Sequence, residues 1–328
     1  MADVPMRPLG ANIFGMFHTP PNGDYDAMYS SWNFERDWKN QIDAAASIGA
    51  NCMSYFGSIN LTGTLANYLG QRRQIVEYLA SKKMYALPYA SCTPRDWGAV
   101  SYETARSIIV ADAAVMGQYP NVAAYMTCDE PWIGSVAEGG SIPNATVVAN
   151  VAAQYAQCKA VVPPDLPVCA APNPGGNQLL VFEYTGAFKD RIDSVAAYND
   201  IWVFHPFYAA TLAQTVPVRA AYPNKEIVMP SAVLSLEGDT DIASRAAAIT
   251  GLVGANGIRG YCWFIVRDFA TFTYGIFAAD SSTPAVLTPR PIKTTAFSAG
   301  ISSIHPQIQR SFSRGKPRLS NMKLWGYK

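Results

Sequence analysis

Short apolar runs alternate along this chain with longer segments in which apolar residues recur every three or four positions. A short run bounded by turn residues is typical of a buried strand, and the longer spacing is typical of a helix packed on one face. We expect strands at residues 9–17, 51–56, 84–90, 122–128, 167–171, 201–206, 226–233 and 257–266. We expect helices at residues 34–48, 65–81, 102–116, 145–161, 178–190, 212–221 and 242–253, with a closing helix within 289–300.

Eight strands joined by seven helices match a (β/α)8 barrel in count and in length. The competing arrangement is a doubly wound open sheet, which usually has fewer strands. The first turn, at residues 16–21, also lacks the glycine-rich phosphate loop of nucleotide-binding sheets. We therefore predict an α/β protein, with a single (β/α)8 TIM barrel over residues 1–309 and a basic aromatic C-terminal tail over residues 310–328.

The fourth apolar run ends abruptly in Asp129, Glu130, Pro131 and Trp132. Parallel α/β proteins place their chemistry at the C-terminal ends of their strands. Pro131 has no N–H, so we expect strand pairing to stop there and Glu130 to be the last residue that the strand holds. Because successive side chains of a strand alternate, we expect Asp129 to point away from Glu130. Trp132 offers a flat apolar face on which a sugar ring can stack.

Three segments resemble glycoside hydrolases of the large (β/α)8 superfamily. The ending Asp129-Glu130-Pro131 is similar to the acidic-Glu-Pro ending that holds the acid/base glutamate in many retaining members. Residues 259–265 resemble the last strand of that family, whose tryptophan, here Trp263, often forms the floor of the sugar site. Residues 274–280 and 289–293 resemble a common family ending. The resemblance implies a hydrolase acting on a polysaccharide or glycan, with Glu130 as its general acid/base.

Glycoside cleavage needs one carboxylic acid that protonates the leaving oxygen and a second carboxylate across the anomeric carbon. We expect the charge of Asp129 and a partly apolar rim to raise the pKa of Glu130, although a rim carboxylate paired with an arginine is the structural alternative. Retaining members commonly carry the second carboxylate at the end of the seventh strand, where this chain has no acid. The catalytic candidates are therefore Glu237, in the following loop, and Asp268, after the eighth strand. If neither reaches the site, the barrel binds sugar without cleaving it.

Most other strand ends carry an aromatic ring or a polar side chain that can contact a sugar. With Asp129 and Trp132, the candidate substrate-binding residues are His18, Tyr55, Tyr89, Asn173, His205, Tyr208 and Trp263. Each residue alone is more common as packing than as a ligand contact. For His205, a structural histidine with satisfied hydrogen bonds is the alternative.

Composition narrows the remaining function classes. Charged residues make up 15% of the chain and the net charge is +1, so neither nucleic acid nor an anionic membrane is an expected partner. No apolar run is long enough to predict a membrane span. The six cysteines form no C-x-x-C pair, and the three histidines form no His-Glu-x-x-His motif. We therefore expect buried free thiols, no metal site and no cofactor.

Residues 310–328 carry six basic side chains and no acidic one, interleaved with Gly315, Pro317, Trp325 and Tyr327. A solvated tail is the simplest interpretation, and docking on the barrel or on a partner protein is the one we favour. The first residues do not form a signal peptide, which together with free thiols predicts synthesis in the cytoplasm. A second hypothesis follows: a non-catalytic carbohydrate-binding or structural barrel within a larger assembly, such as a bacteriophage virion or tail.

Overall fold

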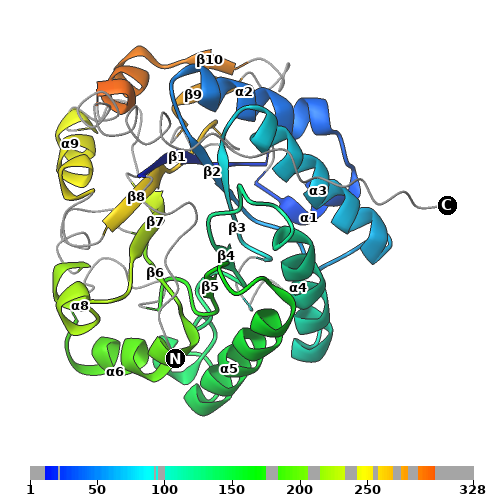
Figure 1. The fold of residues 1–328 in the computed structure, drawn as a ribbon, viewed down its shortest axis with the longest axis vertical. Helices are drawn as coiled ribbons and strands as arrows, with labels where there is room; N and C mark the ends of the chain where they lie inside the picture. The colour runs from blue at the N-terminus through cyan, green and yellow to red at the C-terminus, as the bar shows by residue number, and fades with distance from the viewer. Residues whose placement is uncertain are drawn as a thin grey trace.

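The computed structural model describes residues 12–20, 23–91, 94, 100–174, 184–205, 215–232, 242–253, 258–268, 275–279 and 287–299. Parallel strands stand in the centre with helices around them (Figure 1). The strands are β1 (Ile13–Phe17), β2 (Cys52–Tyr55), β3 (Tyr85–Pro88), β4 (Tyr125–Met126), β5 (Val168–Cys169), β6 (Trp202–Val203), β7 (Ile227–Ala232) and β8 (Ile258–Trp263). The helices are α1 (Tyr25–Ser30), α2 (Asn40–Ser47), α3 (Leu65–Ser81), α4 (Tyr102–Met116), α5 (Asn144–Val161), α6 (Gly186–Val195), α8 (Thr215–Ala221) and α9 (Ile242–Leu252), and residues 291–299 are also helical.

The strands form a closed ring. Six of them pair in the order β3-β2-β1-β8-β7-β6, and β4 pairs with β5, all in parallel. A parallel bridge between Tyr89 and Met126 joins the β3 and β4 segments. The backbone N–H of Asn173 donates to the carbonyl of Val203 (2.7 Å), which joins the β5 and β6 segments. The predicted (β/α)8 barrel is therefore confirmed, and the open sheet is excluded.

The hydrophobic pattern located two of the helices to the residue, α3 and α4. Both begin where a hydroxyl residue can cap the first turn: Thr64 accepts from the amide of Asn67, and Ser101 accepts from the amide of Thr104. Such a cap satisfies an N–H group that has no partner within the helix. The agreement is close because periodicity and capping indicate the same boundary.

Elsewhere the structure differs from the predicted elements. The helix predicted at 34–48 starts with a π-helical turn (Glu35–Lys39) before α2. The helix predicted at 178–190 is α6, which begins at Gly186. The six-residue helix α1 and the antiparallel pair β9 (Phe277–Ala279) and β10 (Leu287–Pro289) were not predicted. Elements this short contain too few residues for a period to be recognised.

The first and last strands of the ring meet too closely for a side chain at residue 260. Gly260, in β8, has a φ of +149°, and a Cβ atom there would lie 1.8 Å from the carbonyl oxygen of Ile13 in β1. Glycine adopts such a conformation at little cost and leaves the space open. The register shift between Ile227 and Val228, where β7 pairs with β8, falls at the same level.

A buried ion pair joins α3 to α4 behind β3. The guanidinium of Arg72 donates two hydrogen bonds to the carboxylate of Asp112, at 2.9 and 2.8 Å, and both side chains are fully buried. Arg72 also donates to the hydroxyl of Tyr29 (3.2 Å) and to the carbonyl of Tyr89 (3.0 Å). The hydroxyl of Tyr125 lies 3.1 Å from Asp112. We call these five residues the Arg72 cluster, and it fixes the backbone of Tyr89 at the end of β3.

The described cysteines agree with the thiols expected from the sequence. Cys52, Cys128, Cys158, Cys169 and Cys262 are all buried and free. Burial raises the pKa of the Cys128 and Cys158 thiols to about 12, because the thiolate would lose its hydration. These side chains therefore act as small apolar groups in the core.

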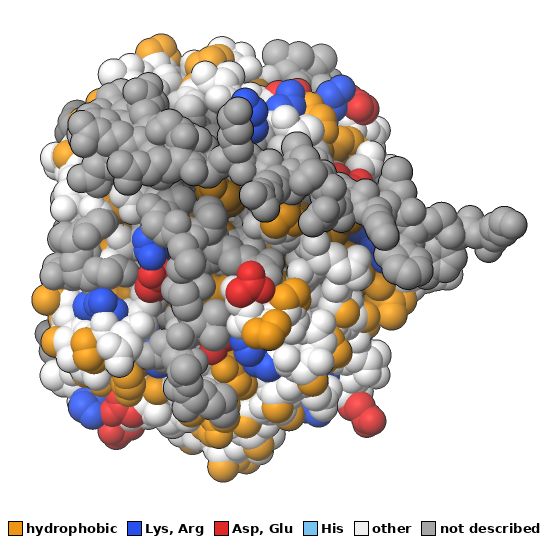
Figure 2. Space-filling view, viewed as in Figure 1, with side chains coloured by type: hydrophobic (Ala, Val, Ile, Leu, Met, Phe, Trp, Pro, Cys, Tyr) orange, Lys and Arg blue, Asp and Glu red, His pale blue; other side chains and the backbone are white. Residues whose placement is uncertain are grey.

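The surface and the helices also fit the composition. On the face shown in Figure 2, charged side chains of both signs are scattered among neutral and apolar ones and do not gather into one patch. Among the helices in the described part of the chain, we find none that could span a membrane.

Candidate active site

Glu130 lies beyond β4, at the C-terminal end of the barrel strands. Its side chain is buried, with 8% of the residue exposed, and its φ is +41°. Residues other than glycine and asparagine rarely adopt this left-handed backbone conformation, which costs of the order of 1–3 kcal/mol. The residues that do adopt it cluster at functional sites. The amide Nδ2 of Asn173, which has a φ of +46°, donates to Glu130 Oε1 at 2.7 Å. The carboxylate is therefore fixed by an amide from the neighbouring strand end.

Asp129 and Glu130 point to the same place. One oxygen of each carboxylate and a ring nitrogen of His205 all lie within 4.8 Å of one another. The predictions that Asp129 points away from Glu130 and that the strand holds Glu130 are therefore wrong. The physical reason is that β4 comprises only Tyr125–Met126, and the left-handed turn at Glu130 ends the alternation of an extended strand.

His205 and Tyr89 complete this group from β6 and β3. The Tyr89 hydroxyl lies 2.8 Å from His205 Nε2, and Asp129 Oδ1 lies 3.6 Å from the same nitrogen. Burial lowers the pKa of His205 to about 3, so its imidazole is neutral near pH 7 and the contact with Asp129 is not an ion pair. Burial also raises the pKa of Tyr89, and the charges of Asp129 and Glu130 add to this effect. The phenol therefore stays protonated, and its O–H group can donate a hydrogen bond to His205.

Aromatic rings from three further strand ends pack beside Tyr89. Phe17 contacts Phe56 (ring centroids 5.0 Å apart), Tyr89 (6.3 Å) and Phe264 (5.8 Å). Phe56 also packs edge-on against Tyr89, at 4.9 Å. These rings form an apolar layer next to the polar group of Asp129, Glu130 and His205. Phe264 was not among the candidate residues.

Two candidate substrate-binding residues, Trp263 and Tyr55, lie between strands and helices instead. The indole of Trp263 packs against Phe297 in the closing helical segment and is fully buried. The hydroxyl of Tyr55 lies 4.0 Å from the sulfur of Met116 in α4, and Arg72 covers its ring at 4.8 Å. The structure does not bring them to Glu130. Side chains alternate in direction along β8, so Trp263 points outward and the next residue, Phe264, faces inward. Phe264 therefore takes the place that we expected for Trp263.

His18 and Trp132 are buried as well. The ring of His18 stacks on Trp38 (3.8 Å), and its Nε2 lies 2.8 Å from the carbonyl oxygen of Asp37. Burial lowers the pKa of His18 to about 3. Trp132 is 2% exposed, and the guanidinium of Arg191 lies 6.0 Å from its ring. The flat face expected to receive a sugar therefore packs within the protein.

Of the two candidates for the second carboxylate, the structure describes Asp268 but not Glu237. Asp268 accepts a hydrogen bond from the Arg290 guanidinium (2.6 Å) and another from the amide of Gly275 (2.9 Å). It therefore ties the segment after β8 to the helix that closes the barrel. Glu237 and Tyr208 lie outside the described residues, as do the tail at 310–328 and its expected docking.

Asp129, Glu130 and His205 are the set of potential metal ligands that lie this close together among the residues described. A metal bound at His205 Nε2 would compete with the Tyr89 hydroxyl, which lies 2.8 Å from the same nitrogen. A neutral imidazole, a phenol and two adjacent carboxylates suit proton transfer better. The absence of a metal remains a prediction.

No family model and no curated protein matches this sequence. Solved structures with a similar fold do exist. A GH5_18 protein from Streptomyces cattleya, in complex with GlcNAc, superimposes with a TM-score of 0.68 at 12% identity, over 90% of this chain and 80% of the other. This chain has the barrel fold of glycoside hydrolases. An apo β-glucosidase aligns over 89% and 98% of the two chains (TM-score 0.62, 14% identity). An exo-β-1,4-mannosidase from an Opitutaceae bacterium aligns over 94% and 62% (TM-score 0.67, 11% identity).

Proposed function

We propose that this glycoside hydrolase-like barrel cleaves a glycosidic bond in a glycan, with Glu130 as the general acid/base. The observation that carries the proposal is the carboxylate of Glu130, held by the Asn173 amide at a left-handed backbone position beside a second carboxylate. The fold supports it, because similar barrels include glycosidases. Fold alone does not fix a reaction, so the proposal depends on this group of side chains.

Asn173 orients the Glu130 carboxylate, and Asp129 affects its protonation. Asn173 binds Oε1 and so orients the carboxylate, and we assign the proton transfer to Oε2. Two carboxylates whose oxygens lie within 4.8 Å of each other repel when both are ionised, so their proximity favours the binding of one proton by the pair. That proton is the one a glycosidic oxygen needs as its bond breaks. Neutral His205 and Tyr89 line the same group without adding a charge that would draw the proton away.

The substrate that we propose is a neutral, β-linked hexose glycan. The solved structures with this fold include β-glucosidases and a β-1,4-mannosidase by name. The aromatic layer of Phe17, Phe56 and Phe264 fits a sugar's apolar face better than an anionic group. Glu237 is our first candidate for the second carboxylate, because Asp268 is bound to Arg290.

The test compares leaving groups. A dinitrophenolate departs without a proton, whereas a sugar leaving group needs one. We expect Glu130→Gln to slow cleavage of an oligosaccharide by about 10²- to 10⁴-fold, and cleavage of the dinitrophenyl glycoside much less. Glu103→Gln, an exposed glutamate of α4, is the matched control and keeps full activity. Equal loss on both substrates, or no loss on either, contradicts the acid role.

The second candidate is a barrel that binds a glycan without cleaving it, within a larger assembly such as a virion or tail. The ion pair between Asp268 and Arg290 favours it, because that carboxylate is already engaged. Calorimetric binding of an oligosaccharide without release of reducing ends would support this candidate. Comparing the oligomeric state with and without residues 310–328 would test a role of the tail in assembly.

A further inference from the structure

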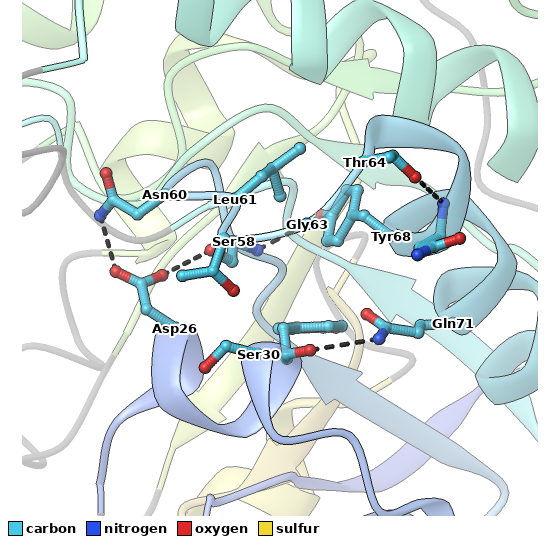
Figure 3. A pocket seen from close by; sticks show the side chains of 12 residues that line it. Asp26, Ser30, Ser58, Asn60, Leu61, Gly63, Thr64, Tyr68 and Gln71 are labelled. Carbon is cyan, nitrogen blue, oxygen red and sulfur yellow. Dashed lines mark hydrogen bonds between the residues drawn. The ribbon is translucent and has the colours of Figure 1, made fainter.

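A cavity opens next to β1 and β2, at the same end of the barrel as Glu130. It lies between α1, the segment at 58–64 that follows β2, and the first turns of α3, and its volume is about 160 Å³ (Figure 3). Because α1 follows β1 and the segment follows β2, the cavity stands at the C-terminal ends of the strands, as Glu130 does. Its lining does not include Glu130 or the residues that contact Glu130.

Its lining is rich in neutral hydrogen-bonding groups. Hydroxyl and amide side chains predominate, and Asp26 is the only ionisable acid or base in the lining apart from two tyrosines. The hydroxyls and amides come from Ser30, Ser58, Thr62, Thr64, Asn60, Asn67 and Gln71. With no lysine, arginine or histidine in this lining, a phosphate or an acidic sugar would meet only the like charge of Asp26. A neutral molecule with many hydroxyl groups fits it.

Asp26 is positioned to accept hydrogen bonds from such a molecule. Its Oδ1 accepts from Ser58 Oγ at 2.5 Å and its Oδ2 from Asn60 Nδ2 at 2.6 Å, which fixes the plane of the carboxylate (Figure 3). A carboxylate offers about four acceptor positions, so each oxygen can accept one more bond. Two neighbouring hydroxyls of a sugar ring present donors at this spacing, and bonds to a charged acceptor are the stronger kind.

The cavity wall is connected to the candidate active site. The hydroxyl of Tyr29, which lines the cavity, donates to the carbonyl of Phe56 (3.1 Å). The ring of Phe56 packs on Tyr89, whose hydroxyl bonds His205. The cavity and Glu130 are therefore held by one set of packed residues at one end of the barrel.

We propose that this cavity is an accessory site that binds a neutral hexose unit of the glycan, apart from the unit that is cleaved. The choice of a glycan rests on the proposed function, whereas the binding itself does not require cleavage. The site would hold a long substrate at a second point and favour chains over single sugars.

The test adds a large side chain at Gly63, which lines the cavity. A Cβ atom at Gly63 meets nothing within 4 Å, so Gly63→Trp brings an indole to the cavity wall without a backbone clash. Gly70→Trp is the matched control. Its Cβ position is equally open, and Gly70 is an exposed residue of α3 that does not line the cavity. Tetrasaccharides of β-1,4-linked glucose, mannose and N-acetylglucosamine are titrated by calorimetry into both variants and the parent protein. Thermal unfolding confirms that each variant is folded.

We expect at least one tetrasaccharide to bind the parent and Gly70→Trp equally, and Gly63→Trp at least about ten-fold more weakly. Equal binding by the two variants, or no tetrasaccharide binding by the parent protein, would overturn the accessory site. Cleavage of a short aryl glycoside by the parent protein tests the proposed function separately. An inactive protein whose tetrasaccharide binding depends on Gly63 would keep the accessory site and remove the hydrolase.

Discussion

Two groups of buried ionisable side chains lie on either side of Tyr89, and they are built on opposite principles. In the Arg72 cluster, a guanidinium and a carboxylate neutralise each other inside two hydrogen bonds, between α3 and α4. In the group around Glu130, two carboxylates share their surroundings with a neutral histidine and an asparagine amide, beyond the strand ends. The first arrangement holds helices together. The second brings two carboxylates together at the C-terminal end of the barrel, and it is the group to which we assign the proposed proton transfer.

Tyr89 couples the two groups. Its carbonyl oxygen accepts from Arg72, and its hydroxyl bonds His205. The neutralised cluster thus fixes the position of Tyr89, which contacts the group around Glu130 through His205. Opposite charges with satisfied hydrogen bonds indicate a structural role, whereas like charges buried together cost stability and are retained where chemistry needs them.

The largest expected effect tests the structural side of this comparison. Arg72→Met leaves the Asp112 carboxylate buried without its partner, and we expect the free energy of unfolding to fall by about 3–5 kcal/mol. Urea denaturation at pH 7 measures this change. Arg73→Met removes a neighbouring exposed arginine and should change stability by less than about 0.5 kcal/mol. A loss below about 1 kcal/mol for Arg72→Met would show that the ion pair does not hold α3 to α4.

An intermediate effect comes from pH. His205 has a pKa of about 3 in the folded protein and an ordinary value near 6.5 when unfolded. Below pH 6.5 the unfolded chain binds a proton that the folded site refuses, so stability is full above pH 6.5 and is lost as pH falls toward 3. We expect the loss between pH 7.5 and 4.5 to be about 2–3 kcal/mol smaller in His205→Gln than in the parent protein.

His18 provides the comparison for that measurement. It is also buried, with its pKa lowered to about 3, but it stacks on Trp38 away from the carboxylates. His18→Gln should reduce the pH-dependent loss by a similar amount and leave cleavage unchanged. Identical pH dependence in all three proteins would mean that neither histidine is held neutral by burial.

The smallest expected effect concerns the reactive side. Glu130→Gln relieves the crowding of two neighbouring carboxylates, so the free energy of unfolding should stay the same or rise by up to about 1 kcal/mol. Asp112→Asn, the same kind of change in the Arg72 cluster, should instead destabilise the protein by several kcal/mol. A loss above about 2 kcal/mol in Glu130→Gln would place Glu130 with the structural charges.

Side-chain direction marks where sequence-based prediction failed. Trp263 and Phe264 are adjacent rings in an apolar run, and no local signal says which one faces the barrel interior. The packing of Trp263 on Phe297, distant in the sequence, decides it. The same holds for Asp129, whose direction follows from the left-handed turn at Glu130 and not from strand alternation.

The order of apolar runs and helical periods was enough to determine the barrel, because each element must bury one face and eight strand–helix units close into a ring. It also placed Glu130, Asn173, Tyr89 and His205 at the ends of strands, where parallel α/β proteins carry their chemistry. Only the tertiary structure decided which side chains meet. Contact among β3, β4, β5 and β6 depends on how the ring closes, and packing between distant segments sets the direction of each side chain.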